Sequence, residues 1–318
     1  MGAIAGSAIL ECSQTNTLDM VTVTINNSCN LSCPHCYLQY NEPSTDGFDR
    51  SILELIARSS FRHLAIVGKE PFLDPKSLLL CGELADVCRG RGITVSVVTN
   101  GLNAVSAPKS LLQQLAFVDI SLDSGRSSYD SYRKGSLAKL ERSLTWIAKA
   151  GTRMNALNVL NATTINFLDE ILLVRELAPF HRIVFSPYLQ TRNYGTNTVD
   201  IIPLASILSR LADSAFKETQ NTTLLLHGEH LNQDRISKQA FWDSVDRHGL
   251  RSKICLLEDY PVKYGVIRVT YDGFVMSPSQ ALHTKLYKLE TNVRVSNLSS
   301  STLESAFNRI GRASLTAQ

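Results

Sequence analysis

The feature that most constrains this chain is the regular alternation of strand and helix patterns over residues 20–186. Short β-branched runs are typical of strands, and apolar residues three and four positions apart are typical of a buried helix face. Strands that alternate with helices form a parallel sheet with right-handed crossover connections. The six predicted strands cover residues 21–25, 63–67, 93–98, 117–122, 153–160 and 183–185.

Helical spacing of apolar residues predicts helices between these strands. They lie near residues 52–56 and 111–115, over 76–89 and 167–178, and over a segment from Leu137 that ends near Gly151. Six such units favour an α/β fold of the incomplete (β/α)6 TIM-like barrel type, although an open doubly wound sheet has the same pattern. In both folds we expect the functional site at the carboxyl ends of the strands.

The composition excludes several classes of protein. A net charge of +3 is too small to indicate a nucleic-acid partner, and no apolar run approaches the length of about 18 residues that a membrane-spanning helix needs. Residues 3–10 are apolar but follow no Lys or Arg, so they make a poor signal peptide. We therefore expect a cytoplasmic protein that contacts neither nucleic acid nor membrane, with residues 1–19 as a flexible leader.

Three of the seven cysteines fall within eight residues, at Cys29, Cys33 and Cys36. A structural zinc site needs four ligands, and the only local fourth candidate is His35, directly beside Cys36. Three thiolates on one loop suit a [4Fe–4S] cluster instead, which usually has four Cys ligands. One iron would then stay open for a ligand from outside the protein. The spacing therefore predicts one [4Fe–4S] cluster held by these three thiolates.

The segment Cys29-Asn-Leu-Ser-Cys33-Pro-His-Cys36-Tyr37 follows the first predicted strand and resembles the signature of radical S-adenosylmethionine (SAM) enzymes. The resemblance implies that the open iron binds SAM and that an electron from the cluster cleaves it, giving a 5′-deoxyadenosyl radical. That radical abstracts a hydrogen atom from the substrate. In such enzymes the cofactor supplies the chemistry, while the protein orients it and keeps water out.

Polar residues after the next strands resemble the SAM-binding motifs of this family. Gly68-Lys69-Glu70-Pro71 resembles its GGEP motif, which holds the methionyl ammonium of SAM. The resemblance implies that Glu70 is a ligand, whereas Lys69 departs from the second glycine. Arg133 matches the arginine whose planar fork pairs with the SAM carboxylate. The SAM-binding residues implied by the resemblance are Gly68, Lys69, Glu70, Asn100, Ser121, Asp123, Arg133 and Asn158.

Three further polar residues follow the sixth predicted strand at the same rim, namely Tyr188, Gln190 and Arg192. Loops at such a rim carry specificity, so we predict that these side chains face the substrate.

After about residue 195 the resemblance becomes thin. Cys255, followed by a predicted hairpin of Tyr264–Thr270 and Phe274–Met276, resembles the start of the SPASM or twitch extension of the family. That extension has a cysteine after the hairpin, and this chain has none there, so an auxiliary cluster is not expected. We predict a radical SAM core over residues 20–200 and a small α+β twitch-like cap without auxiliary cluster over residues 201–318. Cys255 is either a relic of that cluster or a hydrogen-atom donor.

Four other residues are assigned structural roles. Cys81 and Cys88 share one face of a predicted helix and are expected in the core. His227 and His230 show no helical periodicity and are expected in a solvated loop.

The hairpin favours the branch of the family that modifies ribosomally synthesised peptides. The expected outcomes are side-chain crosslinking, epimerisation, or splicease-type excision of a tyramine-like piece that leaves a β-amino acid. Only about 20 residues precede the first strand, so we expect a separate small protein to recognise the leader peptide. We also expect an electron donor of the flavodoxin or ferredoxin type. Two alternatives are a radical SAM small-molecule tailoring enzyme, such as a dehydrogenase or mutase, and a non-catalytic iron–sulfur redox protein.

Overall fold

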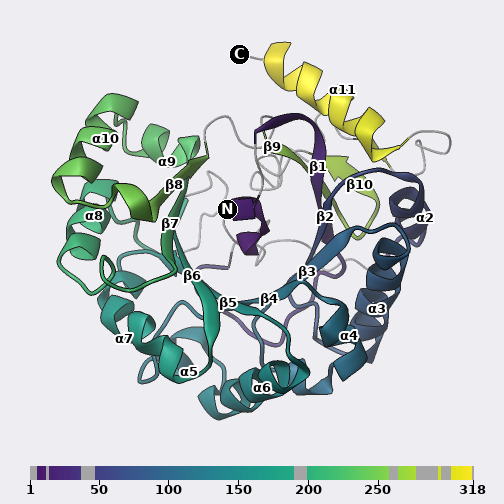
Figure 1. Cartoon of the computed structure of the whole chain (residues 1–318), viewed down its shortest axis with the longest axis horizontal. Helices are drawn as coiled ribbons and strands as arrows, with labels where there is room; N and C mark the ends of the chain where they lie inside the picture. Colours follow the sequence, from purple (N-terminus) through teal and green to yellow (C-terminus); the bar gives the residue numbers. More distant parts are fainter. Residues whose placement is uncertain are drawn as a thin grey trace.

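The computed structural model describes residues 6–11, 14–36, 47–189, 199–257, 264–276, 293–294 and 302–316. Within them the chain forms one sheet of eleven strands in the order β11-β10-β9-β1-β2-β3-β4-β5-β6-β7-β8. Figure 1 shows this sheet curling around a central space, with helices along its outer side. Since β8 and β11 stand at opposite ends of the order, the sheet is not closed. The predicted α/β fold of the incomplete-barrel type is confirmed.

Six neighbouring strands are parallel and carry the alternation read from the sequence. They are β1 (Thr15–Thr24), β2 (His63–Val67), β3 (Thr94–Thr99), β4 (Phe117–Ser121), β5 (Met154–Leu160) and β6 (Phe180–Pro187). The α-helices of this part are α2 (Ser51–Arg58), α3 (Pro75–Arg89), α4 (Lys109–Gln114), α5 (Tyr129–Arg133), α6 (Leu137–Ala150) and α7 (Leu168–Leu172). Short 3₁₀ turns are η2 (Ala104–Ser106), η3 (Thr164–Phe167) and η4 (Leu173–Glu176).

Local signals in the sequence explain where two long helices begin and end. Asp74 caps α3 by accepting a hydrogen bond from the Ser77 amide, and Pro75 occupies the first turn, where a missing N–H is tolerated. Gly151 ends α6 in the left-handed conformation, with a φ of 80°. These boundaries agree with the helices predicted there.

The predicted helix over residues 167–178 is wrong in its extent. That segment is divided among η3, α7 and η4. The buried apolar residues recur three and four positions apart, a spacing that α and 3₁₀ turns can both give, so the pattern alone does not separate the two; they include Ile165, Leu168, Ile171, Leu172 and Val174.

The same sheet continues beyond the six strands at both edges. β7 (Thr222–His227) and β8 (Ile254–Leu257) add two parallel strands beside β6. At the other edge β9 (Tyr264–Val269) runs parallel to β1, and β10 (Phe274–Met276) returns antiparallel to β9, which confirms the predicted hairpin. The strands expected in a cap therefore join the sheet of the core. The remaining elements are α8 (Leu204–Ala212), α9 (Gly228–Gln233), α10 (Lys238–Arg247), η5 (Arg251–Lys253), β11 (Val293–Arg294) and α11 (Leu303–Thr316).

The apolar core has two layers. The larger lies between the outer face of the sheet and the helices, and the smaller fills the inside of the curved sheet. Inside, Met20 of β1 and Val67 of β2 meet Ile9 of η1 (Gly6–Glu11), which Figure 1 shows in the middle of the sheet. Ser7, Ala8 and Ile9 are all buried. The flexible leader expected over residues 1–19 is therefore ordered in its described part, because these residues cover the apolar inside of the sheet.

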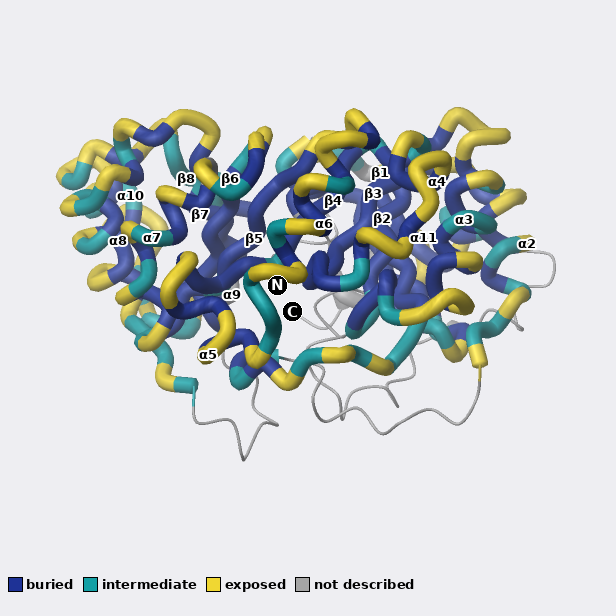
Figure 2. The backbone as a smooth tube through the Cα atoms, turned by 90° about the horizontal axis from the view of Figure 1, so that it is seen from below, coloured by how far each residue is buried: buried dark blue, intermediate teal, exposed yellow. Residues whose placement is uncertain are grey.

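Figure 2 shows buried backbone running through the middle of the molecule, with exposed residues toward its outer surfaces. Among the described residues, no helix has the length and apolar character needed to cross a membrane.

Candidate functional site

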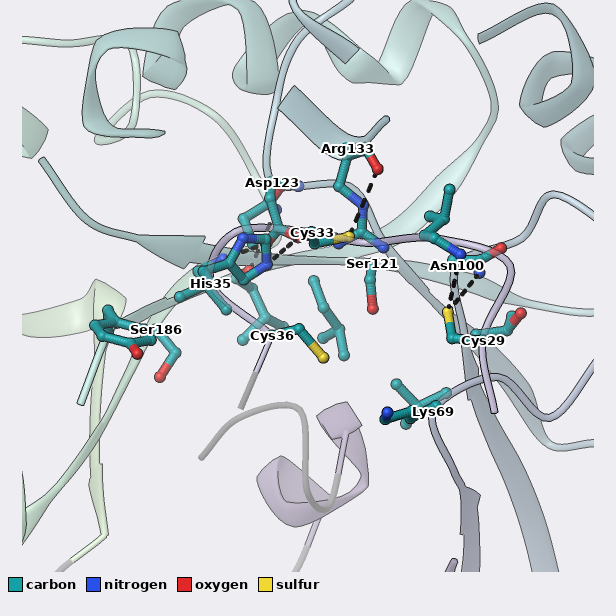
Figure 3. A pocket seen from close by; sticks show the side chains of 18 of the residues that line it. Cys29, Cys33, His35, Cys36, Lys69, Asn100, Ser121, Asp123, Arg133 and Ser186 are labelled. Atoms are coloured by element: carbon teal, nitrogen blue, oxygen red, sulfur yellow. Dashed lines mark hydrogen bonds and ion pairs between the residues drawn. The ribbon is translucent and has the colours of Figure 1, made fainter. Parts of the chain in front are cut away.

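A cavity lies at the carboxyl ends of the parallel strands, where the fold predicts the functional site. It takes residues from the loop after β1 and from the ends of β3 to β6. Figure 3 shows side chains from these segments gathered around the cavity. The predicted site residues that line it are Cys29, Cys33, Cys36, Gly68, Lys69, Asn100, Ser121, Asp123, Arg133, Asn158 and Tyr188.

The thiols of the cysteine loop sit among polar partners at this cavity. The Leu31 amide donates a hydrogen bond to Cys29 Sγ over 3.3 Å, and Asn100 Nδ2 donates to the same sulfur over 3.7 Å. Cys33 Sγ donates to the Arg133 carbonyl oxygen over 3.7 Å. Burial raises the pKa of the Cys29 thiol, and it raises that of Cys33 to about 11. Since burial favours the neutral thiols, a bound metal is needed to hold these sulfurs as thiolates.

The donor set fits an iron–sulfur cluster better than a single metal ion. In the part of the chain that the structure describes, no three ligating side chains converge closely enough to hold one ion. In a [4Fe–4S] cluster each thiolate binds a different iron, so sulfurs spread around a cavity match it without converging. The residues present therefore fit the predicted cluster, and Cys29, Cys33 and Cys36 would be its ligands.

Glu70 does not line the cavity, in contrast to its expected role as a direct SAM ligand. Its carboxylate is buried behind the wall, where it accepts hydrogen bonds from the Phe72 amide over 2.8 Å, the Asn100 amide over 2.7 Å and the Thr99 hydroxyl. Burial raises the pKa of Glu70, and these hydrogen bonds oppose the rise. Glu70 therefore joins the end of β2 to the end of β3 and sets the position of Asn100.

Asp123 is the anionic centre of the cavity wall. Its backbone is left-handed, with a φ of 58°, and its Oδ1 accepts a hydrogen bond from the Val159 amide over 2.6 Å. Its Oδ2 pairs with Arg133 and lies 3.0 Å from His35 Nε2. Burial alone would raise the pKa of the Asp123 carboxyl, but His35 and Arg133 outweigh it and lower the pKa to about 2. The carboxylate therefore stays ionised and holds both partners.

Arg133 has a buried donor that no described residue satisfies. Its Nη1 contacts Asp123, whereas its Nε is buried without a hydrogen-bond partner. Leaving a buried N–H without an acceptor costs about 1–3 kcal/mol. Since Arg133 lines the cavity, a carboxylate bound there would supply the missing acceptor. The site therefore fits the SAM carboxylate that the resemblance places at this arginine.

A buried chain of polar side chains lies behind the cysteine loop, and the sequence indicates no role for it. His35 Nδ1 lies 3.0 Å from the Tyr132 hydroxyl oxygen, which accepts a hydrogen bond from Asn161 Nδ2 over 2.9 Å. The rings of His35 and Tyr132 are stacked, with centroids 5.4 Å apart. Together with the contact to Asp123, these side chains tie the cysteine loop to the ends of β4 and β5. The sequence feature that could have indicated a role for this chain of side chains is the position of His35 between two clustered cysteines.

Gly68 and Lys69 form the wall of the cavity just after β2. A Cβ at Gly68 would lie 2.8 Å from Asn26 Oδ1, so a larger residue at this position would have to displace the Asn26 side chain. Lys69 lines the cavity, and Figure 3 shows its side chain directed into it.

Asn158, Ser121 and Tyr188 also line the cavity. The Asn158 amide supports the wall, because Oδ1 accepts a hydrogen bond from the Asp123 amide over 3.2 Å and Nδ2 donates to the Val184 carbonyl over 3.3 Å. Of the three predicted substrate contacts, Tyr188 is thus brought to the site, while Gln190 and Arg192 lie outside the described residues.

Other residues singled out in the sequence lie away from the cavity lining. Cys255 is on β8 and packs against the inner core, and Cys81 and Cys88 are buried in α3 as predicted. The prediction of a solvated loop at His227 and His230 is wrong, since both are buried. The reason is that α9 begins directly after β7, and the His227 amide donates to His230 Nδ1 over 2.9 Å.

One known protein family matches the part of the chain that contains most residues of this site. The Radical SAM superfamily matches residues 23–172, a stretch that runs from β1 to the end of α7 and includes the cysteine loop and Arg133. None of the curated proteins compared with the chain matches it.

Solved structures share the fold. Streptococcus suis SuiB bound to precursor peptide SuiA matches with a TM-score of 0.68 and 14% identity, covering 98% of this chain and 70% of that one. SuiB bound to S-adenosylmethionine matches with a TM-score of 0.57 and 13% identity, over 91% and 65% of the two chains. Native anSMEcpe with bound AdoMet and Kp18Cys peptide matches with a TM-score of 0.61 and 19% identity, over 93% and 82%. The chain therefore carries a radical SAM superfamily domain over residues 23–172 and is a radical SAM enzyme, with a [4Fe–4S] cluster and S-adenosylmethionine as its cofactors.

Proposed function

We propose that this protein holds one [4Fe–4S] cluster through Cys29, Cys33 and Cys36, cleaves SAM reductively, and abstracts a hydrogen atom from a ribosomally synthesised peptide. One observation carries the proposal: the three cysteines line the same cavity as Arg133, whose buried Nε has no hydrogen-bond partner among the described residues. A redox relay would use the thiols but has no use for an arginine with an unsatisfied donor beside them.

The chain's own residues bind, orient and exclude water. The bound cluster supplies the electron that breaks the sulfonium C–S bond of SAM. Arg133 binds the SAM carboxylate, and Asp123 holds Arg133 in place. Asn100 and Ser121 offer polar contacts to the rest of SAM from the ends of β3 and β4. Apolar residues keep water away from the reacting atoms; those that line the cavity include Val98, Leu157, Val159 and Val184.

A peptide is the substrate class that the structural neighbours support. SuiB was crystallised with a precursor peptide and anSMEcpe with the Kp18Cys peptide. Crosslinking, epimerisation and tyramine excision are the reactions that we propose for such a substrate, and small-molecule tailoring is the alternative. The family match argues against a non-catalytic redox protein.

Several finer expectations stay predictions. They are the separate leader-recognition protein, the flavodoxin- or ferredoxin-type donor, the cytoplasmic location, the boundary near residue 200 and the twitch-like character of residues 201–318.

Anaerobic reconstitution tests the core of the proposal. We expect about four irons per chain, and dithionite with SAM should yield 5′-deoxyadenosine. Changing Cys29, Cys33 and Cys36 together to Ala should abolish both, whereas Cys255→Ala is the matched control that should keep both. About eight irons would contradict a single cluster. A full cluster that gives no 5′-deoxyadenosine would refute the enzymatic function.

Co-expression tests the peptide substrate. A short peptide encoded beside this gene should be modified when the enzyme is present and should stay unmodified with the cysteine variant. Crosslinking or tyramine excision changes the peptide mass, whereas epimerisation keeps the mass and shows as a D-amino acid in chiral analysis of the hydrolysed peptide. A peptide that keeps its mass and contains no D-amino acid in the presence of an active enzyme would favour the small-molecule alternative.

A further inference from the structure

The charged side chains at the cavity have partners, with one exception. Asp123 is held between Arg133 and His35, and Glu70 accepts three hydrogen bonds behind the wall. The exception is Lys69, whose ammonium group forms no ion pair or hydrogen bond with the described part of the chain. The described lining therefore carries one uncompensated positive charge, at Lys69.

The backbone around Lys69 is fixed by Asn26, in the loop that follows β1. Its amide donates a hydrogen bond to the Asn26 carbonyl over 3.4 Å, and Asn26 Nδ2 donates to the Glu70 carbonyl over 2.8 Å. Lys69 is half-buried, and it lines the same cavity as the three clustered cysteines. In Figure 3 its ammonium end points toward the space that Cys29 and Cys36 face. The positive charge is therefore held close to the expected position of the cluster.

A cation in such a position makes an iron–sulfur cluster easier to reduce. The reduction potential of a cluster depends on the net charge around it and on its exposure to solvent. Reduction adds one negative charge, and a nearby ammonium stabilises that charge more strongly in a water-poor cavity than in bulk water. Val98, Leu157 and Val184 make part of this cavity apolar.

We propose that Lys69 raises the reduction potential of the bound cluster, so that a weaker electron donor suffices. The proposal rests on the proposed function, because it requires the cluster at Cys29, Cys33 and Cys36. It gives a physical role to the one position of the Gly68–Pro71 motif that departs from the family pattern.

A redox titration monitored by EPR on the reconstituted full-length protein, without SAM, tests this role. Lys69→Met keeps the apolar stem of the side chain and removes its charge. We expect the equilibrium constant for cluster reduction to fall by about ten-fold, which is about 59 mV for a one-electron couple. Lys69→Arg keeps the charge and should stay within about two-fold of wild type. Lys76→Met is the matched control, because Lys76 is exposed on α3 and does not line the cavity.

Iron content and thermal unfolding show whether each variant assembles its cluster, and Lys69→Gln replaces Lys69→Met if the latter does not. An unchanged potential in an uncharged variant with full iron content overturns the proposal. A loss of SAM affinity with an unchanged potential also overturns it, since Lys69 would then bind SAM. Failure of both uncharged variants to assemble overturns it as well, because the lysine would be needed for cluster binding itself. A wild-type chain that binds no cluster refutes the proposed function instead, so the two failures are distinguishable.

Discussion

Arg133 is buried and paired with Asp123, yet its Nε has no hydrogen-bond partner among the described residues. Its Nη1 pairs with Asp123, and its own carbonyl accepts the Cys33 thiol over 3.7 Å, so the arginine is fixed next to an expected cluster ligand. A guanidinium can hold one carboxylate and present further N–H groups to a second one. An ammonium has no planar fork, so lysine is not an equivalent replacement here.

Arg133→Lys is expected to weaken SAM binding by about ten-fold or more while the iron content stays at the wild-type level. Loss of a charge-assisted hydrogen bond costs about 1.5–3 kcal/mol, and about 1.4 kcal/mol is ten-fold in Kd. Equilibrium binding of SAM to the reconstituted protein measures the change. Arg126→Lys is the control, since Arg126 is exposed and pairs with Glu141. Equal SAM affinity in the two variants would contradict the role of Arg133.

The single residues that could be predicted belong to local motifs. The three cysteines lie within eight residues, and their type and spacing are enough to indicate a cluster. Side-chain direction could not be predicted, because it depends on distant partners. Glu70 faces the Asn100 amide, 30 residues away, instead of the cavity, and His35 contacts Tyr132, 97 residues away.

At the scale of elements, the parallel strands were predictable because they are short runs of mainly apolar residues, which is typical of strands buried on both faces. All five residues of β2, for example, are buried. Their neighbours at the edges were not predictable. A hairpin pattern indicates that β9 pairs with β10, but it does not indicate that β9 also joins β1. The same holds for η1, whose short apolar segment finds its place only inside the assembled sheet.

A buried carboxylate anchors η1. The Ser7 amide and hydroxyl donate hydrogen bonds to Asp119 over 2.6 and 2.7 Å, and Asn155 Nδ2 donates to the same carboxylate over 3.0 Å. Burial outweighs these hydrogen bonds and raises the pKa of Asp119 from 3.8 to about 6. The ionised carboxylate is therefore less stable in the folded chain than in the unfolded one.

Because the folded-state pKa is the higher one, the contribution of Asp119 to stability is fully present below its unfolded pKa and is lost as the pH rises through about 6. Measured by urea unfolding, the stability of wild type relative to Asp119→Asn should be about 1 kcal/mol greater at pH 5 than at pH 7.5. Asp213→Asn, at an exposed aspartate, should show no such difference. The same stability difference at both pH values would rule out this role of Asp119.

At the scale of the whole molecule, η1 fills the inside of the sheet toward one end, and the described residues line a cavity toward the other. η1 contacts Asp119 and Asn155 toward the amino ends of β4 and β5, whereas Ser121 and Asn158 of the same strands line the cavity. Apolar side chains fill the space between them. We therefore expect SAM and substrate to bind at the carboxyl ends of these strands.

The C-terminal strands complete this sheet, and removing them should expose its edge. β9 pairs with β1, whose Val21 and Val23 are fully buried. A chain that ends at residue 263 lacks β9, β10, β11 and α11 and leaves the β1 edge unpaired, which favours aggregation. We expect this chain to elute as aggregates in size-exclusion chromatography, whereas a chain shortened only by residues 317–318 should elute like the full-length protein. A soluble monomer of residues 1–263 that still assembles the cluster would show that the C-terminal strands are a separate unit.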